Sequence, residues 1–232
     1  SWDQIKIGVF SREDSIEFYE QMLAEREWVL GPDHPYTLTA RNNLAGAYKS
    51  AGRFGEAIEL YEQVLAERER VLGADDPDTL NARNNLAGAY KSVGRLAEAI
   101  ELYEQVLADR VRVLGPDHPD TLNTRDNLAG AYRSVGRFGE AVELYEQVLA
   151  EYERVLGADH PDTLNTRDDL AGAYELVGRL AEAIDEWEKL LPDCQRILGL
   201  EHPLTKRVEK NLEAAKRKMN PPDTPSPETG ED

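Results

Sequence analysis

A repeat of 42 residues constrains the fold of this chain more than any other feature of its sequence. The pentapeptide Leu-Ala-Gly-Ala-Tyr begins at Leu44, Leu86, Leu128 and Leu170, always 42 residues apart. Residues 86–127 and 128–169 are identical at 33 of 42 positions. Chance does not produce such similarity, so the four periods must share one local structure.

Each period has the pattern of two helices. In the third period, Pro119 stands where the first turn of a helix tolerates proline, directly after His118, a capping candidate. Apolar residues then recur at helical spacing up to Gly136, a residue typical of helix ends. A second helix is expected from about Phe138 to Gly157. Because one helix pair cannot bury both apolar stripes, the pairs are expected to stack into an all-α solenoid.

The repeat boundaries divide the chain into four segments. Residues 1–33 are expected to form a half repeat, with a degenerate or truncated first helix followed by a second helix. Residues 34–201 hold four complete helix pairs, and residues 202–219 are expected to form a charged capping helix. Residues 220–232 lack an apolar stripe and are expected to be disordered. Because the array starts within a repeat, we interpret the chain as a fragment of a longer array.

The repeat carries the signature of a known family. Its signature positions are occupied, in order, by Leu128, Ala129, Tyr132, Gly136, Ala141 and Tyr145. The chain thus resembles the tetratricopeptide repeat proteins over roughly residues 11–219. The usual unit has about 34 residues, and the longer unit here is similar to that of kinesin light chains and many bacterial signalling proteins. The resemblance implies a right-handed superhelix of antiparallel helix pairs and a protein-interaction scaffold, in bacterial relatives often the sensing end of larger regulatory proteins.

The resemblance also implies an inner groove lined by the first helix of each pair. Carried onto this sequence, the candidate peptide-binding residues are Asn42, Asn43, Lys49, Asn81, Asn84, Asn85, Lys91, Asn123, Asp126, Asn127, Arg133, Asn165, Asp168 and Asp169. Asparagine is unfavourable inside helices, but its amide can both donate to and accept from an extended peptide. The repeat glycine, such as Gly88, is expected to clear space for that peptide. A bland polar face, copied by duplication, remains the alternative.

The composition of these positions changes along the chain. The Asn-Asn pairs at 42–43 and 84–85 are replaced by Asp168-Asp169 in the fourth repeat, where Glu175 also replaces the cation at position 49. We therefore expect a ligand to place acidic residues at the first two repeats and basic residues at the fourth.

Charge and composition exclude several classes of function. The chain has 27 Lys+Arg and 45 Asp+Glu, a net charge of −18, whereas nucleic acids and anionic membranes require clustered cations. No apolar run of about 18 residues predicts a membrane span. The single cysteine, Cys194, favours a reducing cytoplasm. Catalytic motifs and metal-ligand spacings are absent from the sequence, so we expect neither enzymatic activity nor a cofactor.

Three further series recur with the repeat. The first, His34, His118, His160 and His202, is interpreted as loop or cap residues. The second, Arg41, Arg83, Arg125 and Arg167, is expected to pair with acidic residues of neighbouring helices, with ligand carboxylates as the alternative. The third, Tyr61, Tyr103 and Tyr145, is interpreted as core.

Two alternatives to the binding scaffold stay open. One is self-association through an exposed N-terminal end, as a homo-oligomer in which Trp2 or Ile16 contacts another copy. The other is an engineered or near-consensus array without a ligand of its own, because high identity between repeats also marks such arrays.

Overall fold

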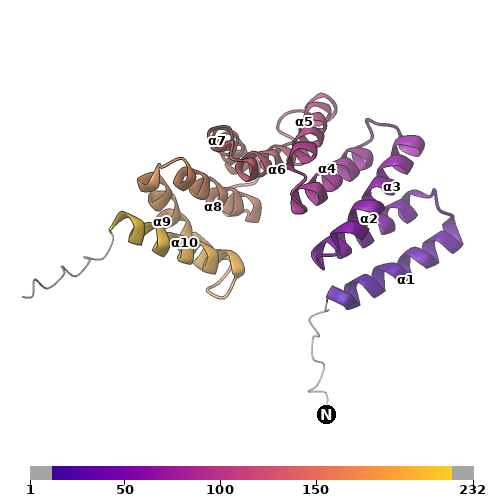
Figure 1. Cartoon of the computed structure of the whole chain (residues 1–232), viewed down its shortest axis with the longest axis horizontal. Helices are drawn as coiled ribbons and strands as arrows, with labels where there is room; N and C mark the ends of the chain where they lie inside the picture. The colour runs from indigo at the N-terminus through magenta and orange to yellow at the C-terminus, as the bar shows by residue number, and fades with distance from the viewer. Residues whose placement is uncertain (1–11, 221–232) are drawn as a thin grey trace, which may run out of the picture. The chain divides into compact units, whose positions relative to one another are not determined.

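The computed structural model describes residues 12–220, a range that contains helices and no strand (Figure 1). The helices of this range are α1 (Arg12–Leu30), α2 (Pro35–Ser50), α3 (Phe54–Leu72), α4 (Pro77–Ser92), α5 (Leu96–Val113), α6 (Pro119–Val135), α7 (Phe138–Val155), α8 (Pro161–Leu176), α9 (Leu180–Ile197) and α10 (Pro203–Met219). The predicted all-α array of helix pairs is confirmed. The truncated helix expected over residues 1–10 and all but the first residue of the expected tail lie outside the described residues.

The chain divides into two compact units between Ala131 and Tyr132, inside α6. The first unit contains α1 to α5 and most of α6, and the second contains the end of α6 and α7 to α10. From α1 to α5, and again from α7 to α10, each helix packs against the next one in the sequence. This nearest-neighbour packing is what the repeat predicts.

The first helix of each repeat begins at a capping residue followed by proline. The Nδ1 atom of His34 accepts a hydrogen bond from the backbone N–H of Tyr36 at 3.2 Å, and Asp76 accepts one from Asp78 at 2.9 Å. His118, His160 and His202 make the same 3.2 Å bond. Each bond satisfies one of the unpaired N–H groups at a helix start. The interpretation of the histidines as cap residues is confirmed.

The core follows the repeat signature. Leu80 and Ala87 of α4 are fully buried, and the tyrosines of the second helices, such as Tyr61 and Tyr103, are nearly so. The interpretation of the tyrosine series as core is confirmed. Ile16, proposed above as a contact in self-association, is buried against α2, so that expectation is wrong. Trp2, named with it, lies outside the described residues.

Two arginines are buried in the core of the first unit, which the sequence analysis did not predict. The Arg110 guanidinium donates to the carbonyl of Asp120 at 2.7 Å and to Oγ1 of Thr124 at 2.6 Å. Arg68, 42 residues earlier, donates to the carbonyl of Asp78 at 2.8 Å. Burial lowers the pKa of both guanidinium groups. Each arginine thereby fastens a second helix to the first turn of the next repeat.

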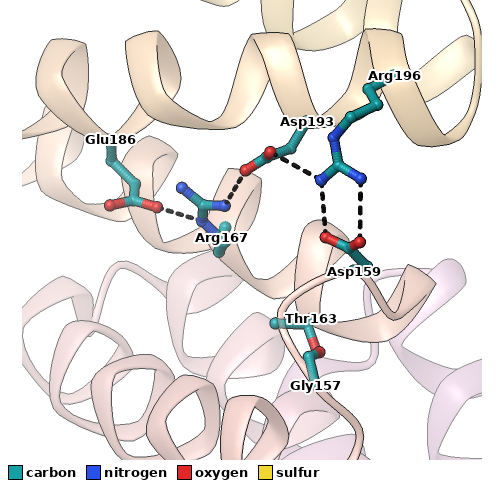
Figure 2. A network of polar contacts seen from close by, with 7 residues as sticks. All are labelled: Gly157, Asp159, Thr163, Arg167, Glu186, Asp193 and Arg196. Carbon is teal, nitrogen blue, oxygen red and sulfur yellow. Dashed lines mark hydrogen bonds and ion pairs between the residues drawn. The ribbon is translucent and has the colours of Figure 1, made fainter.

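A polar network joins helices and loops in the second unit (Figure 2). Arg196 of α9 makes two hydrogen bonds to Asp159, at 2.9 and 3.1 Å, in the loop before α8. Thr163 donates to the carbonyl of Gly157 at 2.8 Å and so closes the same loop. Because the Arg112–Asp75 pair repeats this contact in the first unit, it is a structural feature of the repeat.

The last helix differs from its predecessors on one face. Leu204, Val208 and Leu212 of α10 are buried with α9, as the repeat predicts. In α8, one face packs against α9. The corresponding face of α10 is charged and exposed: Lys206, Glu209 and Glu213 stand at the repeat positions where α2 has Leu38, Arg41 and Ala45.

Between residues 12 and 220, no helix is long and apolar enough to span a membrane.

Candidate functional site

The first unit contains a pocket of about 450 Å³ formed by α1, α2, α3 and α4. Its lining residues are Arg12, Ser15, Tyr19, Asn42, Asn43, Gly46, Ala47, Ser50, Tyr61 and Asn85. None of them is acidic, although the chain carries 45 Asp+Glu. The pocket walls therefore offer mainly hydrogen-bond donors, amides and one guanidinium.

Three of the predicted groove residues lie together at this pocket. The Nδ2 atom of Asn85 donates to Oδ1 of Asn42 at 3.2 Å, across neighbouring first helices. Asn43 is exposed, and its amide makes no hydrogen bond to any residue between 12 and 220. Since an amide has two N–H donors and two lone pairs, all three side chains keep hydrogen-bonding capacity for a ligand.

Lys49, at the C-terminal turn of α2, is a half-buried cation of the same unit. Burial lowers the pKa of its ammonium group from the ordinary value of 10.5. Within the described chain, no carboxylate forms an ion pair with it. A Cβ atom on Gly88 would stand 2.9 Å from Lys49 Nζ and 3.2 Å from the Tyr103 hydroxyl. The expectation that this glycine clears space for a peptide is therefore wrong: its space is taken by Lys49 and Tyr103.

Other predicted groove residues of the first unit bond within the array. Arg110 donates to Oδ1 of Asn81, and Thr124 donates to Oδ1 of Asn84 at 3.4 Å. Asn127 donates to Asn123 at 3.1 Å. Lys91 and Asp126 are half-buried, and both have polar or charged partners. The structure thus divides the predicted asparagines of this unit into three at the pocket and four in contacts between or along helices.

In the second unit, the predicted carboxylates are neutralised by the chain itself. Asp168 is buried and accepts hydrogen bonds from Trp187 Nε1 at 2.8 Å and Arg207 Nε at 2.6 Å. The partner of Asp169 is Arg133, at 2.9 Å.

The remaining acidic and amide positions of the fourth repeat contact α10. The Glu175 carboxylate accepts from Lys218 at 2.6 Å. Asn165 is exposed and accepts a 3.3 Å bond from Arg207. These partners remove the free negative charge that was expected to attract basic ligand residues to the fourth repeat.

Three of the four arginines in the series beside the groove are also bound internally. Arg41 contacts Glu27 at 2.7 Å, and Arg83 contacts Glu69 at 2.7 Å. Figure 2 shows Arg167 between Glu186 and Asp193, at 2.6 and 3.1 Å. These three arginines pair with neighbouring helices, as expected, and their carboxylate partners leave little reason to assign them to a ligand.

Sequence reasoning missed Arg12 and Ser15 at the pocket. Aligning α1 with α3 reveals them, because the residues 42 positions later are the apolar Phe54 and Ala57. Two apolar positions of the repeat are thus polar only in α1, where they border the pocket. No cluster of His, Cys, Asp or Glu that could hold a metal ion occurs between residues 12 and 220.

Comparisons with known proteins agree with this architecture. The family model of the tetratricopeptide repeat matches residues 12–69, 51–110, 78–150 and 127–186. Crystal structures of a putative kinesin light chain from Podosopora anserina, with nearly identical repeats, are similar to the chain. One, of a point variant, is 36% identical and covers 80% of this chain and 87% of that chain, with a TM-score of 0.65. Another is 32% identical and covers 90% and 89%, with a TM-score of 0.61.

A third structure, BtubC (BKLC) from P. vanneervenii, shares the fold. It is 20% identical and covers 96% of this chain and 97% of that chain, with a TM-score of 0.70. A comparison with curated protein sequences gave no match. The repeat signature, the helix pairs and the matched family model lead to one conclusion: the chain belongs to the tetratricopeptide repeat family.

Proposed function

We propose that this protein is a non-catalytic interaction scaffold that binds an extended segment of a partner protein in the pocket of the first unit. The observation that carries the proposal is an acid-free pocket in a chain with a net charge of −18. Duplication of a solvated face does not account for it, because Arg12 and Ser15 depart from the repeat there. Members of the family generally mediate protein–protein interaction.

The chemistry of the pocket favours a ligand with acidic side chains. Asn42, Asn43 and Asn85 can hydrogen-bond an extended backbone, which presents alternating N–H and C=O groups. Arg12 of the pocket and Lys49, one turn along α2 from Gly46 of the pocket, can pair with carboxylates, since neither has an ion-pair partner among the described residues. Hydrogen bonds to charged groups contribute about 1.5–3 kcal/mol each.

A polyanionic nucleic acid is a poor alternative ligand, because the cations at the pocket are few and the rest of the chain is acidic. We also propose a cytoplasmic location. The single cysteine is free and buried, as expected of a protein in a reducing compartment.

Selection from a displayed library of random linear peptides against the whole chain tests the proposal. We expect selected peptides to be enriched in Asp and Glu and to lose at least about tenfold in affinity when Asn43 and Asn85 are both replaced by alanine. The matched control is Asn165→Ala, an exposed asparagine of the second unit. Selection of peptides without acidic residues, or equal affinity for all variants, would contradict the proposal.

A further inference from the structure

The outer face of α1 departs from the repeat at three large apolar residues, Phe18, Met22 and Trp28. This face, here named the α1 stripe, consists of Phe18, Gln21, Met22, Glu25, Trp28 and Val29. Phe18, Trp28 and Val29 are 54%, 90% and 72% exposed. A hollow of about 620 Å³ lies against Phe18, Gln21, Met22, Ala24 and Glu25. Large apolar groups gathered on one exposed helix face indicate an interaction surface.

The register of the repeat shows what such a face normally contacts. In α3, Leu60 packs on Leu44 and Ala47 of the first helix of the same repeat, and Arg70 pairs with Asp33 at 2.7 Å. These residues of α3 correspond to Phe18 and Trp28. The α1 stripe is therefore the face that a first helix covers in later repeats, and no residue between 12 and 220 covers it.

Three of the positions at which α1 departs from α3 lie on that face. Toward α2, α1 keeps the residue types of the repeat, with Ile16, Tyr19 and Leu23 matching those of α3. On the stripe, Leu60 becomes Phe18, Val64 becomes Met22 and Arg70 becomes Trp28. If a further first helix packed on the α1 stripe, the residue types found at these positions in α3 would already suit it. Larger apolar groups, and a tryptophan in place of an arginine, indicate a different occupant, since aromatic residues and methionine are enriched at interfaces.

The pattern of the stripe is self-complementary. When two copies of α1 pack antiparallel about a two-fold axis near Leu23, Phe18 of one copy faces Trp28 of the other. The Gln21 amide then faces the Glu25 carboxylate, and the same contacts recur on the other side of the axis. Such a reciprocal arrangement is the hallmark of a two-fold interface.

Head-to-tail stacking of α10 on the stripe is disfavoured by charge. The first helices α2, α4, α6 and α8 carry an arginine at one repeat position, and α10 carries Glu209 there. In a head-to-tail stack, Glu209 of one copy would face Glu25 of the next. In the repeats, the residues equivalent to Glu25 accept from such arginines, as Asp109 accepts from Arg83 at 3.1 Å. Like charges at this position oppose an open filament of copies.

We propose that a second copy of this chain covers the α1 stripe, in an antiparallel two-fold dimer. The stripe runs along about 15 Å of helix between Phe18 and Trp28, so the contact is small and the dimer forms reversibly. Each copy has a net charge of −18, and repulsion between the copies weakens as salt screens it. The dimer is therefore expected to tighten between about 0.05 and about 0.5 M salt. This dimer is independent of the peptide-binding proposal, because the pocket lies on different residues.

Sedimentation equilibrium of the whole chain tests the dimer. We expect the average mass to rise with concentration from 26.1 kDa toward twice that value. Trp28→Arg restores the residue of later repeats, so it should fold normally and weaken the dimer at least about tenfold. Tyr36→Asp, which also replaces an exposed aromatic by the residue of later repeats, should leave the dimer unchanged. A monomer at all concentrations, or equal effects of the two variants, would overturn the proposal.

Cysteine cross-linking tests the position of the axis. In the proposed dimer, the two copies of residue 22 lie near the axis, whereas the two copies of residue 18 are offset along it by about 15 Å. Oxidation should therefore cross-link Met22→Cys and not Phe18→Cys, because a disulfide needs Cα atoms within about 7 Å. The reverse pattern would exclude this packing. A chain that dimerises only after removal of residues 1–11 would show that those residues cover the stripe, which also overturns the proposal.

Discussion

The side chain of Lys49 and the backbone of Gly88 meet across two successive first helices: Lys49 Nζ lies 2.9 Å from the position that a Cβ on Gly88 would occupy. The absence of a side chain at Gly88 lets an ammonium group without an ion-pair partner lie against the next repeat, beside the Tyr103 hydroxyl. Lys49 lies one turn along α2 from Gly46, which lines the pocket of the first unit. Its contact with Gly88 explains why a residue with poor helix propensity occupies a helix interior.

Alanine at this glycine should therefore behave differently from alanine at the equivalent glycine of α2. Gly46→Ala meets only the Tyr61 hydroxyl, at an ordinary 3.4 Å, and should stabilise the chain by about 0.5–1 kcal/mol through helix propensity. Gly88→Ala must displace Lys49 and Tyr103, so its gain should be smaller or negative. Urea denaturation of both variants measures the difference; equal stabilisation would contradict the close approach.

Removal of the buried Arg110 should destabilise the chain strongly. Arg110→Ala removes the buried guanidinium donor to the Asp120 carbonyl and the Thr124 hydroxyl, and we expect a loss of about 2–4 kcal/mol in the free energy of unfolding. The matched control is Arg112→Ala, which breaks an exposed ion pair with Asp75 and should cost less than about 1 kcal/mol. Similar losses for the two variants would contradict the role assigned to Arg110.

Acid should weaken the fold through carboxylates paired with arginine. Arg196 holds the pKa of Asp159 below its ordinary value of 3.8. A group with a depressed pKa stabilises the fold above its unfolded pKa, and that contribution disappears as the pH falls through the folded pKa. In Asp159→Asn the melting temperature should therefore decline less below about pH 4 than in the unmodified chain. Identical declines in thermal scans would contradict this role.

The histidine caps provide a fourth test. His160→Ala removes the acceptor for the Asp162 N–H and should cost about 0.5–2 kcal/mol. His160→Asp places in α8 the residue that Asp76 provides in α4, so it should keep most of the stability. Thermal melting of the two variants at neutral pH separates them. A stable alanine variant would show that this cap contributes little.

Much of the fold was predictable because the repeat fixes it locally. Proline after a capping residue starts α4 and α8, and the apolar spacing of the repeat identifies the core around Tyr103 and Leu80. These features depend on residues that are close together in the sequence. They therefore recur in each 42-residue repeat.

The pairing of polar groups was less predictable, because it depends on which helices lie opposite. The sequence suggested Asp168 as a groove residue, whereas the structure buries it between Trp187 and Arg207, a residue that appears only in α10. Arg110 resembles a solvated charge in the sequence but reaches the first turn of α6. Departures from the repeat carry the most information about function, as Arg12 and Trp28 show by their places at the pocket and on the α1 stripe.

The most direct measurement of the proposed function is the affinity of the whole chain for one selected acidic peptide, by isothermal titration at low salt. Lys49→Met keeps the length of the side chain and removes its charge, and Lys210→Met does the same at an exposed position of α10. We predict that Lys49→Met weakens binding at least about tenfold and that Lys210→Met leaves it unchanged. Equal affinities for the two variants would contradict a binding site for acidic segments at the pocket of the first unit.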